Sequence, residues 1–460
     1  MIRTKQRIYL EIETKKREFF SRCYFALKAA NKGFCVVIGK KNKLHQNLEK
    51  LENGHYIFKS AGLKTEQLAP KFKNLKFIPY AFDEEGGIII SPLDTSRRVL
   101  SNALNQIEKY FSWGNDERNA ILSTMPDQEK KIINTGNPRV DLLKEKNRQI
   151  YLEEINNIKN KYGNFNLYAS SFHKFNAVGN SKNSNWIKET LKAGLMKKEH
   201  YEHNLTVNQM QKENLEKTLE FFKQYEKQDA LPKLIIKPHP AEDTQVYKKL
   251  IKNFKNIILI EDHISIVPWI LACNFFISYN STAQIESSLL GKKPINLEFI
   301  RDKNLVFEIT RLVSENINTL NEVFNYLRNK NVKQNISEKV NLYKNLSKSI
   351  YNIDDKVCSV ENICNNLSIN KLHKFRDDFK MTKLNFFYMR MNSRVNNIKI
   401  FIKNLLSKKN RELYEMTKNK NPGISFKEVE STIKMLNNIY QFKDIKVKEI
   451  LPSLYSIEKK

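Results

Sequence analysis

Apolar positions in the first third of the chain alternate between two periods, one typical of strands and one typical of helices. Residues 8–12 form a short apolar run, residues 18–32 carry apolar side chains at helical spacing, and residues 34–38 form a second apolar run. Gly33 and Gly39 suit the ends of the helix and of the second run. This succession predicts a strand–helix–strand unit, the first unit of a doubly wound parallel sheet. Further strands are predicted at residues 56–58, 76–78, 88–90, 109–113 and 131–133.

The alternation becomes more regular after residue 166. Apolar runs of strand length are separated there by segments with helical spacing, which predicts a second parallel sheet covered by helices. The predicted strands lie at residues 167–171, 234–236, 257–260, 275–278 and 294–297, and the predicted helices between them lie at residues 241–254, 265–272 and 282–290.

From about residue 316 the pattern is helical and strongly basic. Residues 371–460 contain 21 Lys or Arg and 9 Asp or Glu, and residues 384–389 and 398–406 interleave apolar and basic side chains. Such a tail either packs back across the domains or attaches the protein to an anionic membrane surface. The chain is therefore expected to have three parts: a first α/β domain over residues 1–165, a second over residues 166–315, and a helical basic extension over residues 316–460.

Composition narrows the class of protein. The chain has 460 residues, 40% of them hydrophobic, so sizeable cores are expected and wholesale disorder is not. The first 20 residues carry charges every few positions, so no signal peptide is expected, and the sequence has no uncharged apolar stretch of about 18 residues. The five cysteines lack metal-ligand spacing, and with no secretory leader they predict unpaired thiols and a cytoplasmic location.

The formal net charge of +29 has several explanations. It is compatible with a Lys- and Asn-rich background composition, and equally with attraction to nucleic acid, to an anionic membrane surface or to an anionic substrate. Charge alone does not choose among these. Because no recognised nucleic-acid module accompanies it, nucleic acid is not the expected partner.

The stretch Lys237-Pro238-His239-Pro240 follows directly on a predicted buried strand. Parallel sheets bind ligands at the carboxyl ends of their strands, so these side chains are expected at a ligand-binding edge. The two prolines stiffen the turn and fix the direction of His239. A histidine there can donate to a phosphate or to a sugar hydroxyl, and Lys237 adds positive charge. The competing interpretation is a strand-ending turn with an ordinary exposed histidine.

A second loop at the same predicted edge contains Ser281 and Thr282, between a strand and a helix. One of them is expected to be the N-cap, and the N–H groups of the first helical turn then form an anion site suited to a nucleotide phosphate. Glu286 is expected one turn further on, where a carboxylate can hold ribose hydroxyls. An ordinary helix cap explains the Ser-Thr pair equally well when it is taken alone.

Two acidic stretches fall in the first domain. Asp83, Glu84 and Glu85 precede two glycines, and this pattern predicts a tight, exposed turn. Either crowding raises the pKa of one carboxyl and suits it to general-base chemistry, or the turn is an ordinary solvated one. Glu13 and Arg17 belong to a charged loop after the first strand, where they either contact an acceptor or form a solvated helix start.

Taken in order, these stretches resemble bacterial surface-carbohydrate biosynthesis proteins, and in particular capsule-type transferases that use CMP-activated acidic sugars. The resemblance implies a GT-B-like α/β fold, with two facing Rossmann-like domains and the active site in the cleft. The stretches that carry it are residues 11–18, 83–86, 135–143 and 237–240, Ser281-Thr282 with Glu286, Gly291 and Pro294, and residues 421–425.

The same resemblance assigns roles. Bacterial sialyltransferases share an acid-acid-Gly motif that supplies the general base and a His-Pro motif that contacts the CMP donor. Carried over by position, Glu84 and Glu85 before Gly86 become candidates for the base. The extra acid, Asp83, leaves that choice open. The resemblance implies that His239, Ser281 and Thr282 contact the donor. Together with Lys237, Pro240 and Glu286, they are the expected donor-binding residues.

The expected function is transfer of a sugar, such as Kdo or a sialic-acid-like sugar, from a CMP-linked donor to a surface-polysaccharide or lipid-linked glycan acceptor near Glu13 and Arg17. Enzymes of the resembled type generally use no catalytic metal, and no cofactor or metal site is predicted. A transferase that uses CDP-glycerol or CDP-ribitol to move a polyol phosphate is the alternative enzyme. A basic nucleic-acid- or membrane-binding protein without catalytic activity is the alternative from another class.

Overall fold

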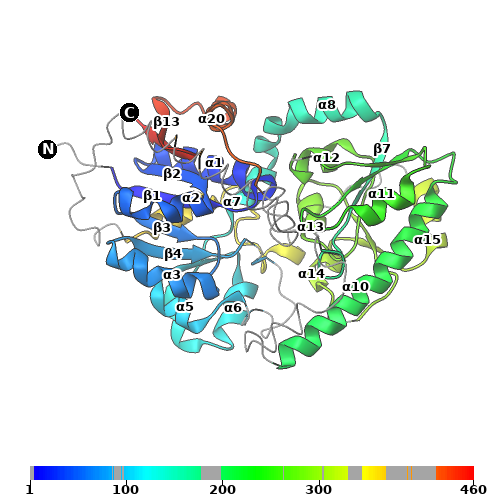
Figure 1. The fold of residues 1–460 in the computed structure, drawn as a ribbon, viewed down its shortest axis with the longest axis horizontal. Coiled ribbons are helices and arrows are strands. Elements are labelled where there is room, and N and C mark those ends of the chain that lie inside the picture. The colour runs from blue at the N-terminus through cyan, green and yellow to red at the C-terminus, as the bar shows by residue number, and fades with distance from the viewer. Residues whose placement is uncertain are drawn as a thin grey trace. The chain divides into compact units, whose positions relative to one another are not determined.

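The computed structural model describes residues 5–84, 86–87, 95, 98–177, 198–262, 264–302, 305–329, 344–368, 391, 395 and 421–460. These residues belong to two units, each built around a sheet of its own (Figure 1). Unit 1 comprises Met1–Ile150, Leu346–Leu406 and Asn421–Lys460, and unit 2 comprises Tyr151–Asn345 and Ser407–Lys420. The chain therefore leaves unit 1 after Ile150 and returns to it at Leu346 and again at Asn421.

Unit 1 contains an 8-stranded sheet in the order β13-β14-β2-β1-β3-β4-β5-β6, in which β2 to β6 are parallel to β1. Strands and helices alternate along the chain, as the hydrophobic pattern predicts. The strands are β1 (Arg7–Ile12), β2 (Cys35–Lys40), β3 (His55–Phe58), β4 (Ile78–Phe82), β5 (Tyr110–Ser112) and β6 (Ile132–Asn134), and the helices are α1 (Lys15–Asn31), α2 (Lys41–Gln46), α3 (Leu63–Asn74), α5 (Ser101–Gln106), α6 (Asn115–Leu122), α7 (Pro138–Leu143) and α17 (Ser359–Asn365).

Two of the strands predicted in this unit need comment. The strand predicted at residues 76–78 begins later, because the N–H of Phe77 donates to the carbonyl oxygen of Phe72 and closes the end of α3, and Lys76 has a φ of 65°. The strand predicted at residues 88–90 lies outside the described residues.

The end of the chain forms a β-hairpin, so the expectation of an all-helical C-terminal part is wrong there. Helix α20 (Phe426–Tyr440) precedes β13 (Ile445–Leu451) and β14 (Leu454–Lys459), and β14 pairs antiparallel with β2. Apolar and basic residues alternate with a period of two over the first four residues of β13, which favours a strand. The exposed lysines of this edge strand oppose pairing with another sheet. The basic stretches 384–389 and 398–406 lie outside the described residues.

Unit 2 contains a 6-stranded sheet in which all strands are parallel, in the order β12-β11-β10-β7-β8-β9. The strand and helix rhythm expected after residue 166 is present. The strands are β7 (Phe165–Ala169), β8 (Lys233–Lys237), β9 (Ile257–Leu259), β10 (Phe276–Ser278), β11 (Ile295–Leu297) and β12 (Glu315–Ile317), and the helices are α8 (Leu152–Tyr162), α10 (Lys198–Tyr225), α11 (Gln245–Ile251), α12 (Ile266–Ala272), α13 (Thr282–Leu289), α14 (Glu308–Leu312) and α15 (Leu320–Asn329).

Each sheet is buried by apolar side chains of its own unit. In unit 1 the rings of Tyr56, Phe58 and Phe72 pack with centroid separations of 4.3 to 4.9 Å. In unit 2 Phe222 from α10 packs edge-on against Tyr168 from β7 at 5.0 Å. These separate cores support the prediction of two α/β domains. Within the described part of the chain, no helix has the length and apolar character needed to cross a membrane.

The stretch from Thr135 to Leu143 anchors the segment that returns from unit 2. The carboxylate of Asp141 accepts hydrogen bonds from the backbone N–H of Ser359 at 2.9 Å and from Asn352 Nδ2 at 2.9 Å. Gly136 has a φ of 75°, and a Cβ there would lie 2.1 Å from Asn352 Oδ1. Residues 135–143 of the resembled motif set therefore have a structural role in this chain.

Candidate functional site

The strand order of unit 2 reverses between β7 and β10, and ligands of open α/β sheets bind at such a reversal, beyond the carboxyl ends of the strands. At that edge Ala169 of β7 lies opposite Lys237 of β8 on one side and opposite Ser278 of β10 on the other. The predicted loops containing His239 and Ser281 therefore leave the same edge of the sheet, with the loop after β7 between them.

His239 has a defined backbone and ring geometry. Its N–H donates to Ser170 Oγ at 3.4 Å, and its Nδ1 accepts the N–H of Ala241 at 3.2 Å. A neutral imidazole whose Nδ1 accepts carries its proton on Nε2, and such an N–H can donate to a phosphate oxygen. The ring also stacks on His173, with centroids 4.4 Å apart and planes at 24°. His239 and Pro240 are both partly exposed.

Lys237 is placed differently from its neighbour. Its side chain is buried, its Nζ forms an ion pair with Asp262, and the same Nζ lies 5.2 Å from the centre of the Trp269 ring. Burial lowers the pKa of Lys237, while Asp262 opposes that shift. The positive charge expected next to a donor phosphate is thus largely balanced by Asp262.

The loop after β10 forms a helix cap, as the sequence predicts. Ser281 is the N-cap of α13, and its Oγ accepts the N–H of Ala283 at 3.3 Å, while Gln284 Oε1 accepts the N–H of Ser281 at 2.8 Å. The Ser281 hydroxyl therefore has a capping role, and the helix dipole adds partial positive charge at this end. Thr282 and Glu286 are partly exposed on the same helix.

A buried carboxyl group that the sequence reasoning did not single out lies behind His239. Glu242 is 3% exposed, and its carboxylate accepts hydrogen bonds from Ser170 Oγ, Tyr247 Oη and the N–H of Phe172, each at 2.7 Å. Burial raises the pKa of Glu242 to about 7, although the hydrogen bonds lower it. The one feature of the sequence that could have pointed to Glu242 is its place three residues after His239.

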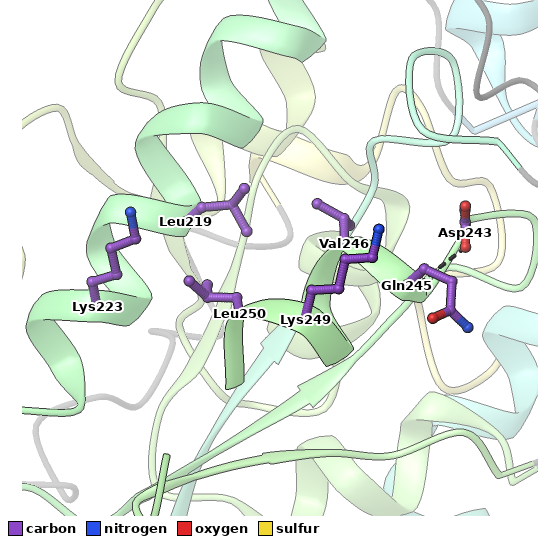
Figure 2. Close-up of a pocket in the computed structure, with 7 residues that line it drawn as sticks. All are labelled: Leu219, Lys223, Asp243, Gln245, Val246, Lys249 and Leu250. Carbon is purple, nitrogen blue, oxygen red and sulfur yellow. Dashed lines mark hydrogen bonds between the residues drawn. The ribbon is translucent and has the colours of Figure 1, made fainter. Parts of the chain in front are cut away.

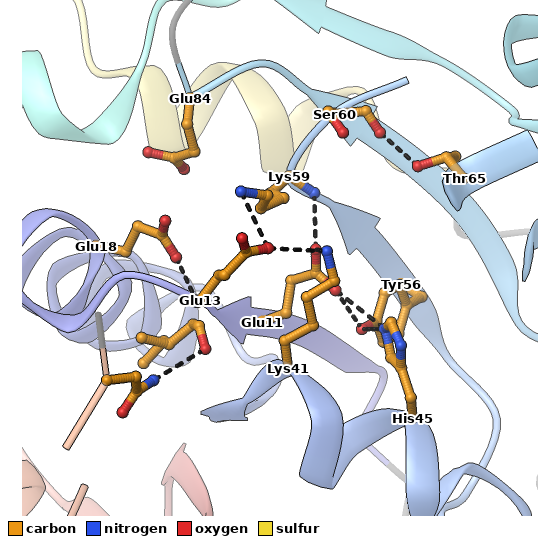
Figure 3. Close-up of polar contacts among 12 residues, drawn as sticks. Glu11, Glu13, Glu18, Lys41, His45, Tyr56, Lys59, Ser60, Thr65 and Glu84 are labelled. Carbon is orange, nitrogen blue, oxygen red and sulfur yellow. Dashed lines mark hydrogen bonds and ion pairs between the residues drawn. The ribbon is translucent and has the colours of Figure 1, made fainter. Parts of the chain in front are cut away.

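The charged loop of unit 1 lies at the carboxyl edge of its sheet (Figure 3). Glu13 Oε2 lies 3.0 Å from Lys41 Nζ and 3.1 Å from Lys59 Nζ. Burial alone would raise the pKa of Glu13, but the two ammonium groups outweigh it and hold the pKa at about 2. Glu11 is fully buried beside them, where its Oε2 accepts from Tyr56 Oη at 3.0 Å.

Glu18 connects the predicted acceptor residues to the predicted base. Its Oε2 accepts the N–H of Glu13 at 2.6 Å, and its Oε1 lies 3.5 Å from Arg17 Nη2. Glu18 is fully buried, and burial together with the nearby charge of Glu84 raises its pKa. The structure therefore brings Glu13, Arg17 and Glu84 to one part of unit 1.

Glu84 is an ionised, buried carboxylate. Its Oε1 forms an ion pair with Arg22 Nη2, and the Arg139 Nη1 atom lies 4.0 Å from its Oε2 and 3.0 Å from its backbone oxygen. Burial raises the pKa of Glu84, but these two guanidinium groups and that of Arg17 outweigh it and lower the pKa. This direction is opposite to the raised pKa that crowding among acids was expected to give.

The acidic turn is buried, so the expectation of an exposed turn is wrong. Asp83 is 7% exposed and Glu84 is 2% exposed, and Asp83 Oδ2 accepts from Arg98 Nε at 2.9 Å. A Cβ at Gly86 would lie 2.3 Å from Glu117 Oε1, so the glycine is needed for close packing against a carboxylate. Burial and the charge of Asp83 raise the pKa of Glu117 to about 7. Glu85 lies outside the described residues.

The sequence reasoning missed the basic partners of these acids. Lys41, Lys59 and Arg22 come from three different elements, and no spacing in the sequence connects them to Glu13 or Glu84. Arg22 lies in the middle of the helical pattern of α1, where its position among apolar residues was the available signal. Within the described ranges, no group of three or more His, Cys, Asp or Glu side chains is arranged to hold a metal ion.

Comparisons with known proteins give structural likenesses only. No family model matches the chain, and no curated protein matches it in sequence. Among solved structures it is similar to the UDP-GlcNAc 2-epimerase of Methanocaldococcus jannaschii, with a TM-score of 0.47 and 15% identity over 79% of this chain and 99% of that chain. It is also similar to the wall teichoic acid polymerase TagF, with a TM-score of 0.47 and 13% identity over 78% of this chain and 88% of that chain. A third similar structure is the UDP-GlcNAc 2-epimerase of Neisseria meningitidis, with a TM-score of 0.44 and 14% identity over 79% of this chain and 100% of that chain.

A groove on the helical layer of unit 2 is separate from the candidate site (Figure 2). It has a volume of about 520 Å³ and lies between α10 and α11. Asp243 at one end accepts the N–H of Gln245 at 3.0 Å. None of the predicted donor-binding residues lines this groove, whose lining residues are Leu219, Lys223, Asp243, Gln245, Val246, Lys249 and Leu250.

Proposed function

We propose that the protein is a glycosyltransferase that moves a sugar from a nucleotide-linked donor to a surface-polysaccharide acceptor, and that unit 2 binds the donor. One observation carries the proposal. His239 and the N-terminus of α13 leave the carboxyl edge of a parallel sheet on either side of the reversal in strand order. Sheets of this type bind nucleotides at that position.

The donor phosphate is assigned to His239 and to the start of α13. The Nε2 proton of His239 and the partial positive charge of the helix N-terminus both stabilise negative charge that develops on a leaving phosphate. Thr282 and Glu286 are assigned to the nucleoside, because both are partly exposed on α13. The charge of Lys237 is paired with Asp262, so Lys237 is proposed to support the donor site by fixing the end of β8 rather than by binding the phosphate.

The acceptor and the general base are assigned to unit 1. Glu13 and Arg17 are proposed to hold acceptor hydroxyls, and the base is proposed among Asp83, Glu84 and Glu85. An ionised Glu84 can accept a proton, but its lowered pKa makes it a weak base. A pH–rate profile of Glu84→Gln tests this assignment. Unchanged transfer by that variant would remove Glu84 from the candidates.

The chemical class of the donor follows from the motif resemblance. A CMP leaving group and an acidic sugar, such as Kdo or a sialic-acid-like sugar, are proposed, with no cofactor and no metal. Thermal-shift measurements with CMP, CDP, UDP and GDP, followed by CMP-sugars and CDP-glycerol, test the donor. Stabilisation by CDP-glycerol instead of a CMP-sugar would favour the polyol-phosphate transferase. Binding of none of these nucleotides would refute the proposal.

His239→Ala tests the site itself. The variant is expected to lose transfer and the CMP-induced thermal shift while it keeps the melting temperature of the wild type, because the ring is partly exposed. Glu226→Ala is a matched control, since Glu226 accepts the N–H groups of Lys255 and Asn256 just before β9, at the opposite edge of the sheet. Full activity of His239→Ala would overturn the assignment.

Peripheral attachment to the cytoplasmic face of an anionic membrane is part of the proposal, because lipid-linked acceptors are membrane-bound. The basic character of residues 371–460 supports it, with 21 Lys or Arg against 9 Asp or Glu. Flotation with vesicles that contain anionic lipid is expected to recover the protein and to fail at high salt. Flotation that does not depend on anionic lipid would exclude this role.

A further inference from the structure

Glu242 is the best connected buried carboxyl group of unit 2, and the proposed transfer chemistry leaves it without a role. Three of its hydrogen-bond donors come from two segments: Ser170 and Phe172 follow β7, and Tyr247 belongs to α11. Among the described residues, no Lys or Arg forms an ion pair with it. A buried carboxyl group without a cation is held by hydrogen bonds alone, and such a group is costly to retain.

A continuous set of hydrogen bonds leads from Glu242 to His239. The N–H of His239 donates to Ser170 Oγ at 3.4 Å, and Ser170 Oγ donates to Glu242 at 2.7 Å. The backbone N–H of Glu242 also donates to the carbonyl oxygen of His239 at 2.9 Å. The carboxyl group and the backbone of Glu242 therefore fix the turn that carries the imidazole.

The same turn is joined to the loop after β7 further along. The N–H of Asp243 donates to the carbonyl oxygen of Asn176 at 2.8 Å, and Asn176 Nδ2 donates to the carbonyl oxygen of Asp243 at 2.9 Å. The ring of His173, in the loop after β7, stacks on the ring of His239, in the loop after β8, which adds a further contact between the two loops. Both loops leave the switch-point edge of the sheet, so their relative position sets the shape of the candidate donor site.

We propose that Glu242 is the positioning residue of the donor site, and that it orients His239 by holding the loops after β7 and β8 together. The expected effect on nucleotide binding rests on the proposed function. The expected effect on the orientation of His239 rests on the hydrogen bonds alone. Glu242 does not touch the donor in this scheme. It acts through Ser170 and the backbone of residue 239.

An amide can replace the carboxyl group in this arrangement. A glutamine oxygen accepts the N–H of Phe172, and its NH₂ group donates to the hydroxyl of Ser170 or Tyr247, both of which also accept. The groups that face Glu242 and titrate are Tyr247 and Tyr168, and burial raises the pKa of both hydroxyls, so they stay neutral. Glu242→Gln should therefore keep the loops in place, whereas Glu242→Ala should release them.

The orientation of His239 is measured first, without nucleotide. In a ¹⁵N-correlated spectrum of imidazole groups, the resonance lost in His239→Ala identifies His239, and the wild type should show a proton on Nε2. Glu242→Ala is expected to lose this single tautomer, and Glu242→Gln to keep it. Asn166→Ala is the matched control, because Asn166 is equally buried at the amino end of β7 and bonds Tyr225 and Phe275 there. An unchanged tautomer in folded Glu242→Ala would overturn the proposal.

Nucleotide binding is measured second, by calorimetry with CMP. Glu242→Ala should weaken CMP binding about 10- to 100-fold, the size expected for the loss of one hydrogen bond to a charged phosphate. Glu242→Gln and Asn166→Ala should bind CMP as the wild type does. Equal CMP affinity in Glu242→Ala and the wild type would contradict the inference. A wild type that binds no nucleotide, with the tautomer still lost in Glu242→Ala, would refute the proposed function and leave the positioning role supported.

Discussion

Replacement of Arg22 by Met tests whether the Arg22–Glu84 ion pair is a buried charge pair on which unit 1 depends. The side chains of Arg22 and Glu84 are 1% and 3% exposed. Arg22 also donates from Nε to the carbonyl oxygen of Glu11 at 3.1 Å, and its guanidinium lies 4.7 Å from the centre of the Phe82 ring. Methionine preserves much of the length and apolar contact of the side chain while it removes the charge.

Removal of one partner from a buried pair costs about 3–5 kcal/mol, because the remaining charge stays buried without compensation. For Glu84 the loss is reduced by Arg139, whose Nη1 lies 4.0 Å from Oε2, so the lower end of that range is expected. The pKa of Glu84 should rise in the variant, since Arg22 has the largest effect among the three charges that lower it.

The free energy of unfolding is measured in a urea titration in which hydrogen exchange of the amides in α1 and β4 is the probe. These amides report on unit 1 separately from unit 2. The double variant Arg22→Met with Glu84→Gln should recover part of the lost stability, because no uncompensated charge remains. Arg118→Met, which breaks an ion pair with a Glu129 side chain that is 67% exposed, should cost about 0–1 kcal/mol.

The pH dependence has a definite sign. The pKa of Glu84 is lowered from 4.5, so the contribution of the pair is present above that pH and is lost as the pH falls through the folded-state pKa. The difference between the wild type and Arg22→Met should therefore shrink in acid. Equal stability of the two proteins at neutral pH, or a double variant destabilised by the sum of the single changes, would refute this reasoning.

Three further predictions concern single side chains. Gly86→Ala should lower the unfolding free energy by about 1–3 kcal/mol in a urea titration, because its Cβ would meet Glu117 Oε1 at 2.3 Å; an unchanged value would show that the turn relaxes without cost. Ser281→Ala should cost about 0.5–2 kcal/mol through loss of the α13 cap, measured by calorimetry, and a neutral effect would mean that the cap is dispensable. Glu242→Gln should change the pH dependence of stability: the pKa of Glu242 rises from 4.5 to about 7 on folding, so its stabilising contribution is full below pH 4.5 and is lost as the pH rises through 7. The melting temperature of Glu242→Gln should therefore not fall with this titration as the pH rises. Parallel plots of melting temperature against pH for the variant and the wild type would contradict this prediction.

Much of the architecture could be predicted because it depends on local periodicity. The alternation of strand and helix patterns in both halves of the chain predicted two parallel sheets. A helix cap at Ser281 or Thr282 was recognisable from the place of this pair between a strand and a helix, and the structure assigns the cap to Ser281. The position of His239 at the carboxyl edge followed from the strand before it. These are properties of neighbouring residues, so a single sequence contains them.

The return of the chain to unit 1 could not be read in the same way. The hairpin β13–β14 joins the sheet beside β2, a strand more than 400 residues earlier in the sequence than β14, and basic composition concealed its period of two. Pairing of distant strands is decided by long-range contacts, to which local composition is a poor guide.

The electrostatics of the site likewise needed the tertiary structure. The sequence by itself singled out Glu13 and Glu84 as acidic candidates in the first domain, but it did not single out Glu242 in the second. Only the fold decided which of them is ionised, because the pKa of a buried acid depends on the charges that distant elements bring to it. Arg22 holds Glu84 charged, whereas Glu242, surrounded by hydroxyl and N–H donors without a cation, has a pKa of about 7.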